Sequence, residues 1–384
     1  NLFTLAGAPA FPLDGTINSV NIGKGANSVA GNTVLGESAL DASVSGGNNT
    51  AIGKNALTAC TSGSSNVGVG FETFETLTEG QFNVAVGRGA SKAQTTASNN
   101  VAVGYNSQLL NTTGTLNASV GALSLDANTT GGSNTAIGYR SLSANTTASN
   151  NTAVGKDALA ANTTGAENTA VGRIALDANT TGSDNVAIGN AALTSATTAS
   201  NNTAVGSRSL LTNTTGTANT AVGHDSLEAN TTANNNSAFG FEALKANTTG
   251  TENTAVGSQA LKANTTANNN TAFGYAPLFA NTTGANNTGI GHSALQSNTT
   301  ASNNTGVGYH ALVANTTGTQ NVAVGANALD ANTTANNNTA LGYIALSANT
   351  TGNQNVGVGT HSLDANTTGS NNTACGVHSL SANT

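Results

Sequence analysis

Residues 151–167 read NTAVGKDALAANTTGAE, and residues 168–184 read NTAVGRIALDANTTGSD. The two stretches align on a glycine, and outward from them a glycine recurs at every seventeenth position from Gly36 to Gly376, with no residue gained or lost. We call these 21 residues the register glycines. A fixed period of this length is typical of a solenoid, in which each repeat buries its apolar face against its neighbours.

The composition favours a stack of repeats over globular domains. Only 7% of the 384 residues are charged and 4% are aromatic, and Met and Trp are absent, which is too little bulky apolar material for ordinary cores. The 46 glycines could indicate disorder, but disordered chains are usually charged or rich in proline, and this chain has three prolines and a strict register. We therefore expect order that arises from stacking.

The residue four positions before each register glycine is asparagine in all 21 copies. Side-chain amides repeated at the spacing of paired strands can hydrogen-bond to the copies above and below, so we predict a structural ladder. The glycine itself permits a positive φ or a close backbone approach. Typical members of the predicted ladder are Asn151, Asn168, Asn185 and Asn202, with Gly155, Gly172, Gly189 and Gly206.

Apolar and small residues alternate just before each register glycine, which predicts a short strand. A leucine lies four residues after the glycine in 18 copies, and it predicts a second short strand whose leucine meets the valine position across a thin core. The predicted core residues are Val154, Val171, Ile188, Leu159, Leu176 and Leu193.

The predicted fold is thus an all-β parallel β-solenoid, or β-roll, with two short strands in each seventeen-residue turn. It occupies residues 32–384, about twenty-one turns. Residues 1–31 break the pattern and are predicted to form a cap or a joining segment, because an open strand edge invites other chains.

Asn-Thr-Thr segments connect the repeats and have the chemistry of turns, since Asn and Thr bond their own backbone. Many also match the N-glycosylation sequon, for example at Asn128, Asn162 and Asn230. In a host that glycosylates extracellular proteins, these loops would be the accessible sites.

The titratable residues do not indicate catalysis or a cofactor. His361 and His378 share a position in adjacent turns, but two imidazoles without a third ligand make a poor metal site, so we expect surface histidines and no metal. Aspartates such as Asp126, Asp177, Asp330 and Asp364 recur five residues after their glycine, at positions predicted to point outward. No acidic pair coincides with a deviation in the core pattern, so we expect a protein that is not an enzyme.

Charge and hydropathy exclude two further classes of partner. The net charge is −7 and the ten Lys and Arg residues form no basic stripe, so no nucleic-acid partner is expected. No apolar run approaches the roughly 18 residues of a membrane span.

The two cysteines lie too far apart in a stack to form a disulfide with each other. Cys375 takes the usual valine position and is predicted to be a buried, inert thiol. Cys60 replaces a loop asparagine and could cross-link neighbouring chains.

The strings Asn134 to Gly138 and Asn168 to Gly172, Asn-Thr-Ala-Ile-Gly and Asn-Thr-Ala-Val-Gly, resemble repeats of bacteriophage tail-fibre proteins. They are also similar to the Ser-Val-Ala-Ile-Gly head repeats of trimeric autotransporter adhesins, although the period of seventeen is longer than the usual adhesin turn. The resemblance extends from Asn32 to the last residue. It implies a left-handed parallel β-roll with three chains side by side, acting as a rigid adhesive stalk or head on a cell surface or virion tail. A host-cell receptor or glycan would then be the partner.

The residues themselves also favour self-association, because a flat face of Ala and Gly beside a slim core gains from burial against another chain. A homo-oligomer around a long axis is expected. Two alternatives to the adhesive fibre remain open. One is a self-polymerising extracellular filament, joined end to end through the N-terminal segment. The other is an ice-binding protein that uses the Thr-Thr ladders as a flat array.

Overall fold

The computed structural model describes residues 15–383, which belong to two compact units, residues 1–184 and residues 185–384. The first fourteen residues of the predicted cap lie outside the described part. The strands of the first unit are β1 (Gly15–Ile17), β2 (Val20–Gly23), β3 (Thr33–Gly36), β4 (Thr50–Ile52), β5 (Val67–Val69), β6 (Val84–Val86), β7 (Val101–Val103), β8 (Ala118–Val120), β9 (Thr135–Ile137), β10 (Thr152–Val154) and β11 (Thr169–Val171). The strands of the second unit are β12 (Val186–Ile188), β13 (Thr203–Val205), β14 (Thr220–Val222), β15 (Ser237–Phe239), β16 (Thr254–Val256), β17 (Thr271–Phe273), β18 (Thr288–Ile290), β19 (Thr305–Val307), β20 (Val322–Val324), β21 (Thr339–Leu341), β22 (Val356–Val358) and β23 (Thr373–Cys375).

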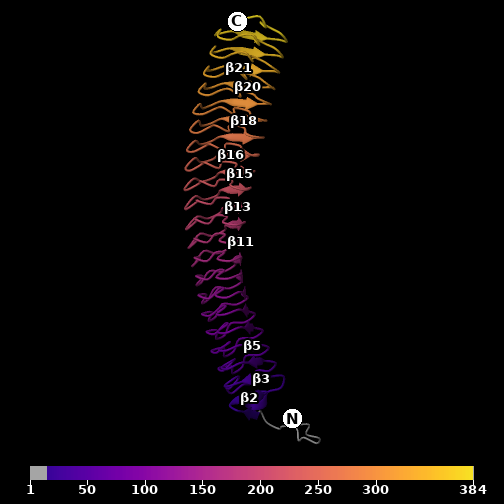
Figure 1. The fold of residues 1–384 in the computed structure, drawn as a ribbon, viewed down its shortest axis with the longest axis vertical. Coiled ribbons are helices and arrows are strands. Elements are labelled where there is room, and N and C mark those ends of the chain that lie inside the picture. The colour runs from indigo at the N-terminus through magenta and orange to yellow at the C-terminus, as the bar shows by residue number, and fades with distance from the viewer. Residues whose placement is uncertain (1–14, 384) are drawn as a thin grey trace. The chain divides into compact units, whose positions relative to one another are not determined.

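From β3 onward, the strands within each unit pair in parallel with an offset of one repeat. Ala153 of β10 faces Ala170 of β11, and Ala204 of β13 faces Ala221 of β14. Successive turns of each unit therefore lie one above the other, as Figure 1 shows for β12 to β23. The predicted all-β parallel β-solenoid with seventeen-residue turns is confirmed.

The prediction of two strands in each turn is wrong, because each turn contains one strand, of four residues in β3 and of three residues from β4 onward. The segment that holds the leucine is a run of turns in which alternate residues are left-handed, with φ values of 54° at Asp157 and 52° at Leu159. An extended strand requires negative φ throughout. The segment is nevertheless tied to its neighbours, since Leu159 N donates to Ala175 O at 3.0 Å and Asp157 N donates to Tyr139 O at 2.9 Å.

The core is built from alanine and leucine. Ala153, the middle residue of β10, and Leu159 are fully buried, and Leu176 and Leu193 are buried in the same way. A methyl group placed on Gly289, which takes the alanine position of β18, would lie 3.2 Å from Leu278 Cγ. The interior is therefore narrow and favours a small residue opposite the leucine; the buried Val34 of β3, the first parallel strand, is an exception.

The predicted core position of the valines needs correction. Val154 and Val171 are half-buried on the outer face of the strand, and Ile188 is 39% exposed. Strand side chains alternate between faces, and the narrow interior accepts the middle residue of each strand, which is usually alanine, so the residues on either side of it point outward.

The register glycines sit where each strand ends. Gly155 has a φ of +133°, and a Cβ on it would lie 2.5 Å from Gly172 O in the next turn. Both the backbone conformation and the close approach require glycine here.

An antiparallel segment covers the first parallel strand of the first unit. β2 pairs antiparallel with β1 on one side and with β3 on the other, and a short 3₁₀ helix, η1 (Ala26–Ser28), connects β2 to β3. β2 thus pairs with the edge of β3 that the solenoid would otherwise leave open.

Candidate interaction surface

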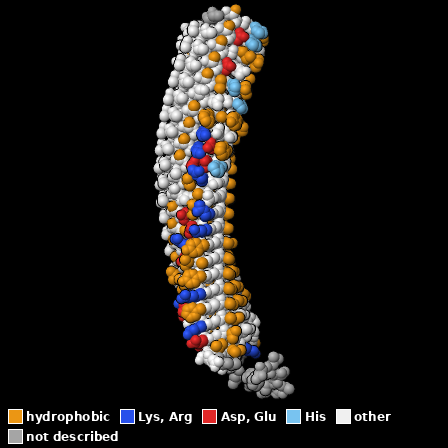
Figure 2. Space-filling model, in the orientation of Figure 1, with side chains coloured by type: hydrophobic (Ala, Val, Ile, Leu, Met, Phe, Trp, Pro, Cys, Tyr) orange, Lys and Arg blue, Asp and Glu red, His pale blue; other side chains and the backbone are white. Residues whose placement is uncertain are grey.

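The outer face of each sheet carries two rows of side chains, three residues and one residue before the register glycine. We call these the outer rows. The first row is mainly Thr and Val, and the second is Val, Ile, Leu or Phe except for Cys375. In the second unit Phe239, Phe273 and Leu341 are 40%, 56% and 48% exposed. The rows form an uncharged, largely apolar strip, and Figure 2 shows hydrophobic side chains along one edge of the visible face.

A separate row, distinct from the outer rows, contains the residue directly after each register glycine. We call it the ring column. All five tyrosines of the sequence lie in it, each about half exposed: Tyr105, Tyr139, Tyr275, Tyr309 and Tyr343. Successive members contact each other along the stack. His292 lies 5.1 Å from Tyr275 and 5.4 Å from Tyr309, measured between ring centroids.

Charged side chains in the second unit form one network over four turns. Lys245 Nζ contacts Asp225 at 2.8 Å, Glu242 at 2.9 Å and Glu228 at 3.4 Å. Lys262 Nζ contacts Glu242 Oε2 at 2.7 Å, and Arg208 pairs with both Asp225 and Glu228. The hydrogen bonds from Lys262 and Lys245 lower the pKa of Glu242 to about 2. The three cations and three carboxylates balance, so the network adds no net charge to this surface.

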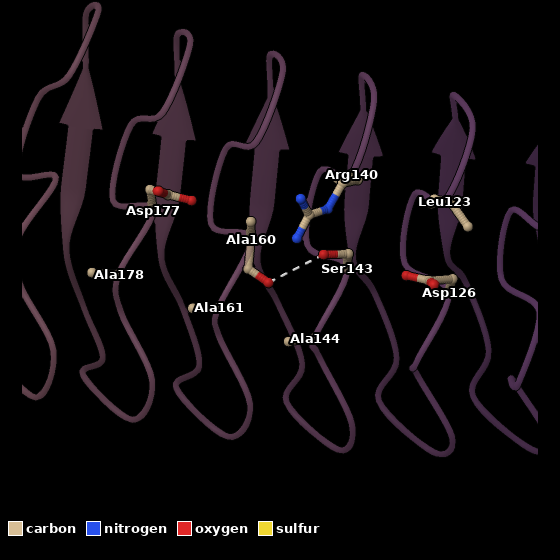
Figure 3. A pocket seen from close by; sticks show the side chains of 9 residues that line it. All are labelled: Leu123, Asp126, Arg140, Ser143, Ala144, Ala160, Ala161, Asp177 and Ala178. Carbon is tan, nitrogen blue, oxygen red and sulfur yellow. Dashed lines mark hydrogen bonds between the residues drawn. The ribbon is translucent and has the colours of Figure 1, made fainter.

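A shallow groove on the first unit lies between two aspartates. Asp126 and Asp177 stand three turns apart in one row, and the intervening positions hold the small residues Ser143 and Ala160 (Figure 3). Arg140 lines the same groove. Burial raises the pKa of both aspartates, and also that of Asp330 in the second unit. These aspartates are half-buried, whereas the sequence predicted that they point outward.

The predicted asparagine ladder runs through the interior of both units. Asn151 Oδ1 accepts bonds from the backbone N of Asn168 at 2.9 Å and from its Nδ2 at 3.2 Å. Asn185 and Asn202 repeat this arrangement in the second unit, at 3.1 and 3.2 Å. These side chains are fully buried and fully engaged, so their role is to join turns.

The asparagine of the Asn-Thr-Thr loops forms a second buried ladder, which was not predicted from the sequence. Asn162 Nδ2 donates to Asn145 Oδ1 at 3.1 Å and to Gly165 O at 2.9 Å. Asn128, Asn162 and Asn230 are all 0% exposed. The expectation that these sequons are accessible is therefore wrong for the folded chain, because the amide nitrogen that would carry a glycan is buried and already donates two hydrogen bonds.

The environments of the two cysteines are the reverse of those predicted. Cys60 takes the position of a ladder asparagine and is buried, with Sγ 3.5 Å from Gly63 O, and burial raises its pKa to about 11. It cannot cross-link chains from this position. Cys375 is exposed because the row before the register glycine faces outward.

Two pairs of histidines lie close together, His292 with His310 and His361 with His378. The rings of His361 and His378 stack with centroids 5.0 Å apart, and His361 Nδ1 lies 2.8 Å from Asp364 Oδ2. Within residues 15–383, no three His, Cys, Asp or Glu side chains are grouped to hold a metal ion. The same residues include no helix long and apolar enough for a bilayer crossing.

The ring column could have been found in the sequence by reading every position along the period of seventeen rather than only the invariant ones. The second ladder was obscured because Asn-Thr-Thr is common turn chemistry, and propensity alone does not show which side chain points inward. No protein-family model matches the chain, and neither the curated proteins nor the solved structures provide a significant match.

Proposed function

We propose that the chain is a non-enzymatic structural fibre protein, located outside the cell or on a virion tail. Its copies associate side by side, in threes, and form an adhesive stalk or head. The observation that carries this proposal is the apolar strip of the outer rows, which leaves residues such as Phe239 and Phe273 exposed in the single chain.

The strip has the properties of a surface that a second copy covers. Contiguous exposed apolar patches mark interaction sites, and soluble oligomers are mostly symmetric assemblies of identical chains. Because every turn advances by the spacing of paired strands, about 4.8 Å, a copy of the same chain matches the strip turn by turn. The resemblance to adhesin and tail-fibre repeats supports three chains and the adhesive role.

The test is the oligomeric state of the full chain, measured by sedimentation velocity and native mass spectrometry over a range of concentrations. We expect a trimer for the wild type. The triple variant Phe239→Thr/Phe273→Thr/Leu341→Thr keeps strand-forming residues but removes apolar surface that contributes about 1 to 2 kcal/mol for each side chain, so it should dissociate.

A matched control removes apolar surface elsewhere. Phe82 and Leu116 are 59% and 60% exposed but lie outside the strip, in a row that is asparagine in many other turns. Phe82→Asn/Leu116→Asn should therefore leave the trimer intact. A wild-type chain that remains monomeric at every concentration would overturn the proposal, as would equal dissociation of the control.

A further inference from the structure

Two successive turns of the first unit carry a polar residue at a core position. Ser91 and Gln108 lie four residues after their register glycines, where the other described turns have leucine or Phe74. Both side chains are fully buried. An apolar side chain at this position contributes to folding through the surface that it removes from water, and these two turns lack that contribution.

The polar atoms of these two residues are only partly paired. Gln108 Nε2 donates to Val101 O at 2.9 Å and to Ser119 Oγ at 3.0 Å. Gln108 Oε1 and Ser91 Oγ are buried without a hydrogen-bond partner. A buried polar atom that gives up its bonds to water and gains none in return destabilises the folded state. Exposure of these turns to water would therefore satisfy two atoms that the closed stack leaves unpaired.

The strand that Gln108 contacts carries a hydroxyl in place of a methyl group. Ser119 is the middle residue of β8, and this position is alanine or glycine in the other strands from β4 onward. Its Oγ accepts the bond from Gln108 and also contacts Ser107 Oγ. Polar groups of this kind bond equally well to water, so their hydrogen bonds add little to the free energy of unfolding.

The second asparagine ladder does not continue through the first of these turns. Where the ladder is present, an amide joins one turn to the next, as Asn128 Nδ2 does by donating to Asn111 Oδ1 at 2.9 Å. Gln94 takes the ladder position one turn before Asn111. Its Nε2 donates to Ala97 O at 2.9 Å and its Oε1 accepts from Asn100 Nδ2 at 3.3 Å. Both of these bonds remain within one turn, so they do not tie the turn to its neighbour.

The backbone connections across these turns are the same as in the rest of the unit. Gln108 N donates to Ser124 O at 3.0 Å, and Leu159 N donates to Ala175 O at the same distance. β7 pairs in parallel with β6 and with β8. The two turns are therefore closed in the folded state, but their side chains support that state less well.

In a stack, each turn contacts only its neighbours, so the free energy of a local opening depends on the turns that open. Residues 88–121 combine two polar core positions, two unpaired buried atoms and a gap in one ladder. The turn of Leu159 has none of these defects, because its leucine is buried and Asn162 Nδ2 donates to Asn145 Oδ1 at 3.1 Å. Opening residues 88–121 thus costs less free energy than opening a segment of equal length around Leu159.

We propose that residues 88–121 are a built-in opening site of the first unit, where the stack unfolds locally while the turns on either side remain closed. The open form hydrates Ser91, Gln108 and Ser119 and breaks the pairing of β7 and β8 with their neighbours. The site depends on the core of one chain and not on the association of copies through the outer rows.

The experiment is hydrogen exchange of the full chain, followed by mass spectrometry with fragmentation to single residues. It compares the backbone amides of Gln108 and Leu159, which donate across one turn at equal distances. After correction for intrinsic exchange rates, we expect the amide of Gln108 to exchange at least about tenfold faster, because lost apolar burial and unpaired atoms both favour the open form. Equal exchange of the two amides would overturn the proposal.

Removal of the polar contact tests its cause. Gln108→Leu/Ser119→Ala restores the usual residues at both positions, so the ratio of the two exchange rates should fall toward one. The ratio is the relevant quantity, because a change in global unfolding would alter both amides alike. A ratio that stays at its wild-type value would show that these residues do not create an opening site.

A matched variant moves the polar pair to another part of the same unit. Leu159→Gln/Ala170→Ser reproduces the spacing of Gln108 and Ser119. Exchange of the backbone amide at position 159 should then accelerate at least about tenfold. Unchanged exchange in the folded variant would contradict the proposal. If this variant does not fold, the ratio measured in the wild type and in Gln108→Leu/Ser119→Ala still decides the question.

Discussion

Asparagine is the residue that joins one turn to the next. In each ladder the side-chain oxygen accepts from the following turn, and Nδ2 donates to a backbone carbonyl, as Asn202 Nδ2 does to Gly216 O at 2.9 Å. A buried amide is stabilising only when its groups are paired, and the period of seventeen pairs them in every turn. Asparagine can therefore fill buried positions where a globular core would use an apolar residue, and it does so in all 21 copies four residues before the register glycine.

Glu242 should make the stability of the second unit depend on pH. Hydrogen bonds from Lys262 and Lys245 lower its pKa from 4.5 to about 2, so the carboxylate contributes stability above pH 4.5 that is lost as the pH falls toward 2. Glu242→Gln should lower the free energy of unfolding by about 2 kcal/mol at pH 7 and by almost nothing at pH 2. Denaturant unfolding of both proteins across this range measures the difference.

The control is Glu252→Gln, which alters an exposed carboxylate outside the network. It should leave the acid dependence of stability unchanged. A Glu242→Gln variant with the same acid dependence as the wild type would show that the ion pairs do not contribute.

Each turn combines one regular element with one irregular one. The strand follows from the alternation before the register glycine, and the sequence predicts it at the correct residues. The second segment could not be predicted as a run of turns, because leucine strongly disfavours positive φ and its intrinsic preference points to a different conformation. Burial of Leu159 and its hydrogen bond to the next turn stabilise a conformation that the isolated segment would avoid.

Local sequence preference also could not show which residues form the core. A pattern of period two shows that strand faces differ, but not which face is inside. Valine was predicted to lie in the core because it is larger than alanine. The narrow interior instead takes the alanine, and the valine lies on the outer face. That width depends on the close approach of the leucine segment, which is a property of the whole turn.

The leucines four residues after each register glycine form a buried row, which we call the leucine column. One polar residue that interrupts this column allows a test of its contribution to stability. Gln108 takes the leucine position, its Nε2 donates to Val101 O at 2.9 Å and to Ser119 Oγ at 3.0 Å, and its Oε1 is buried without a partner. Gln108→Leu/Ser119→Ala restores the usual residues and removes the unpaired oxygen. We expect a gain of about 1 to 2 kcal/mol, measured by denaturant unfolding.

Gln94 provides the matched control, because both ends of this buried glutamine are paired. Its Nε2 donates to Ala97 O at 2.9 Å and its Oε1 accepts from Asn100 Nδ2 at 3.3 Å. Gln94→Leu should cost about 1 kcal/mol. If both variants lowered the free energy of unfolding, the unpaired Oε1 of Gln108 would not be what destabilises the leucine column.

At the scale of the whole molecule, stability is a repeated interaction between neighbours. The strands, the leucine segments and both asparagine ladders connect a turn to the one before and the one after, so within each unit the free energy grows turn by turn. A thin core of alanine and leucine is sufficient because the hydrogen bonds of the ladders recur from turn to turn. Its length can then change in whole turns without loss of the fold.

Deletion of residues 288–304 tests this in the second unit. It removes one complete turn and joins Asn287 to Thr305, which reproduces the Asn304–Thr305 junction and keeps every ladder in register. The shortened chain should fold with an unchanged far-ultraviolet circular dichroism signal per residue and a slightly lower free energy of unfolding. Deletion of residues 288–296 instead removes about half a turn and sets strand residues against loop residues. Because register determines every buried amide pair, this second deletion should abolish cooperative unfolding of the unit, and equal stability of the two variants would refute the repeat-by-repeat account.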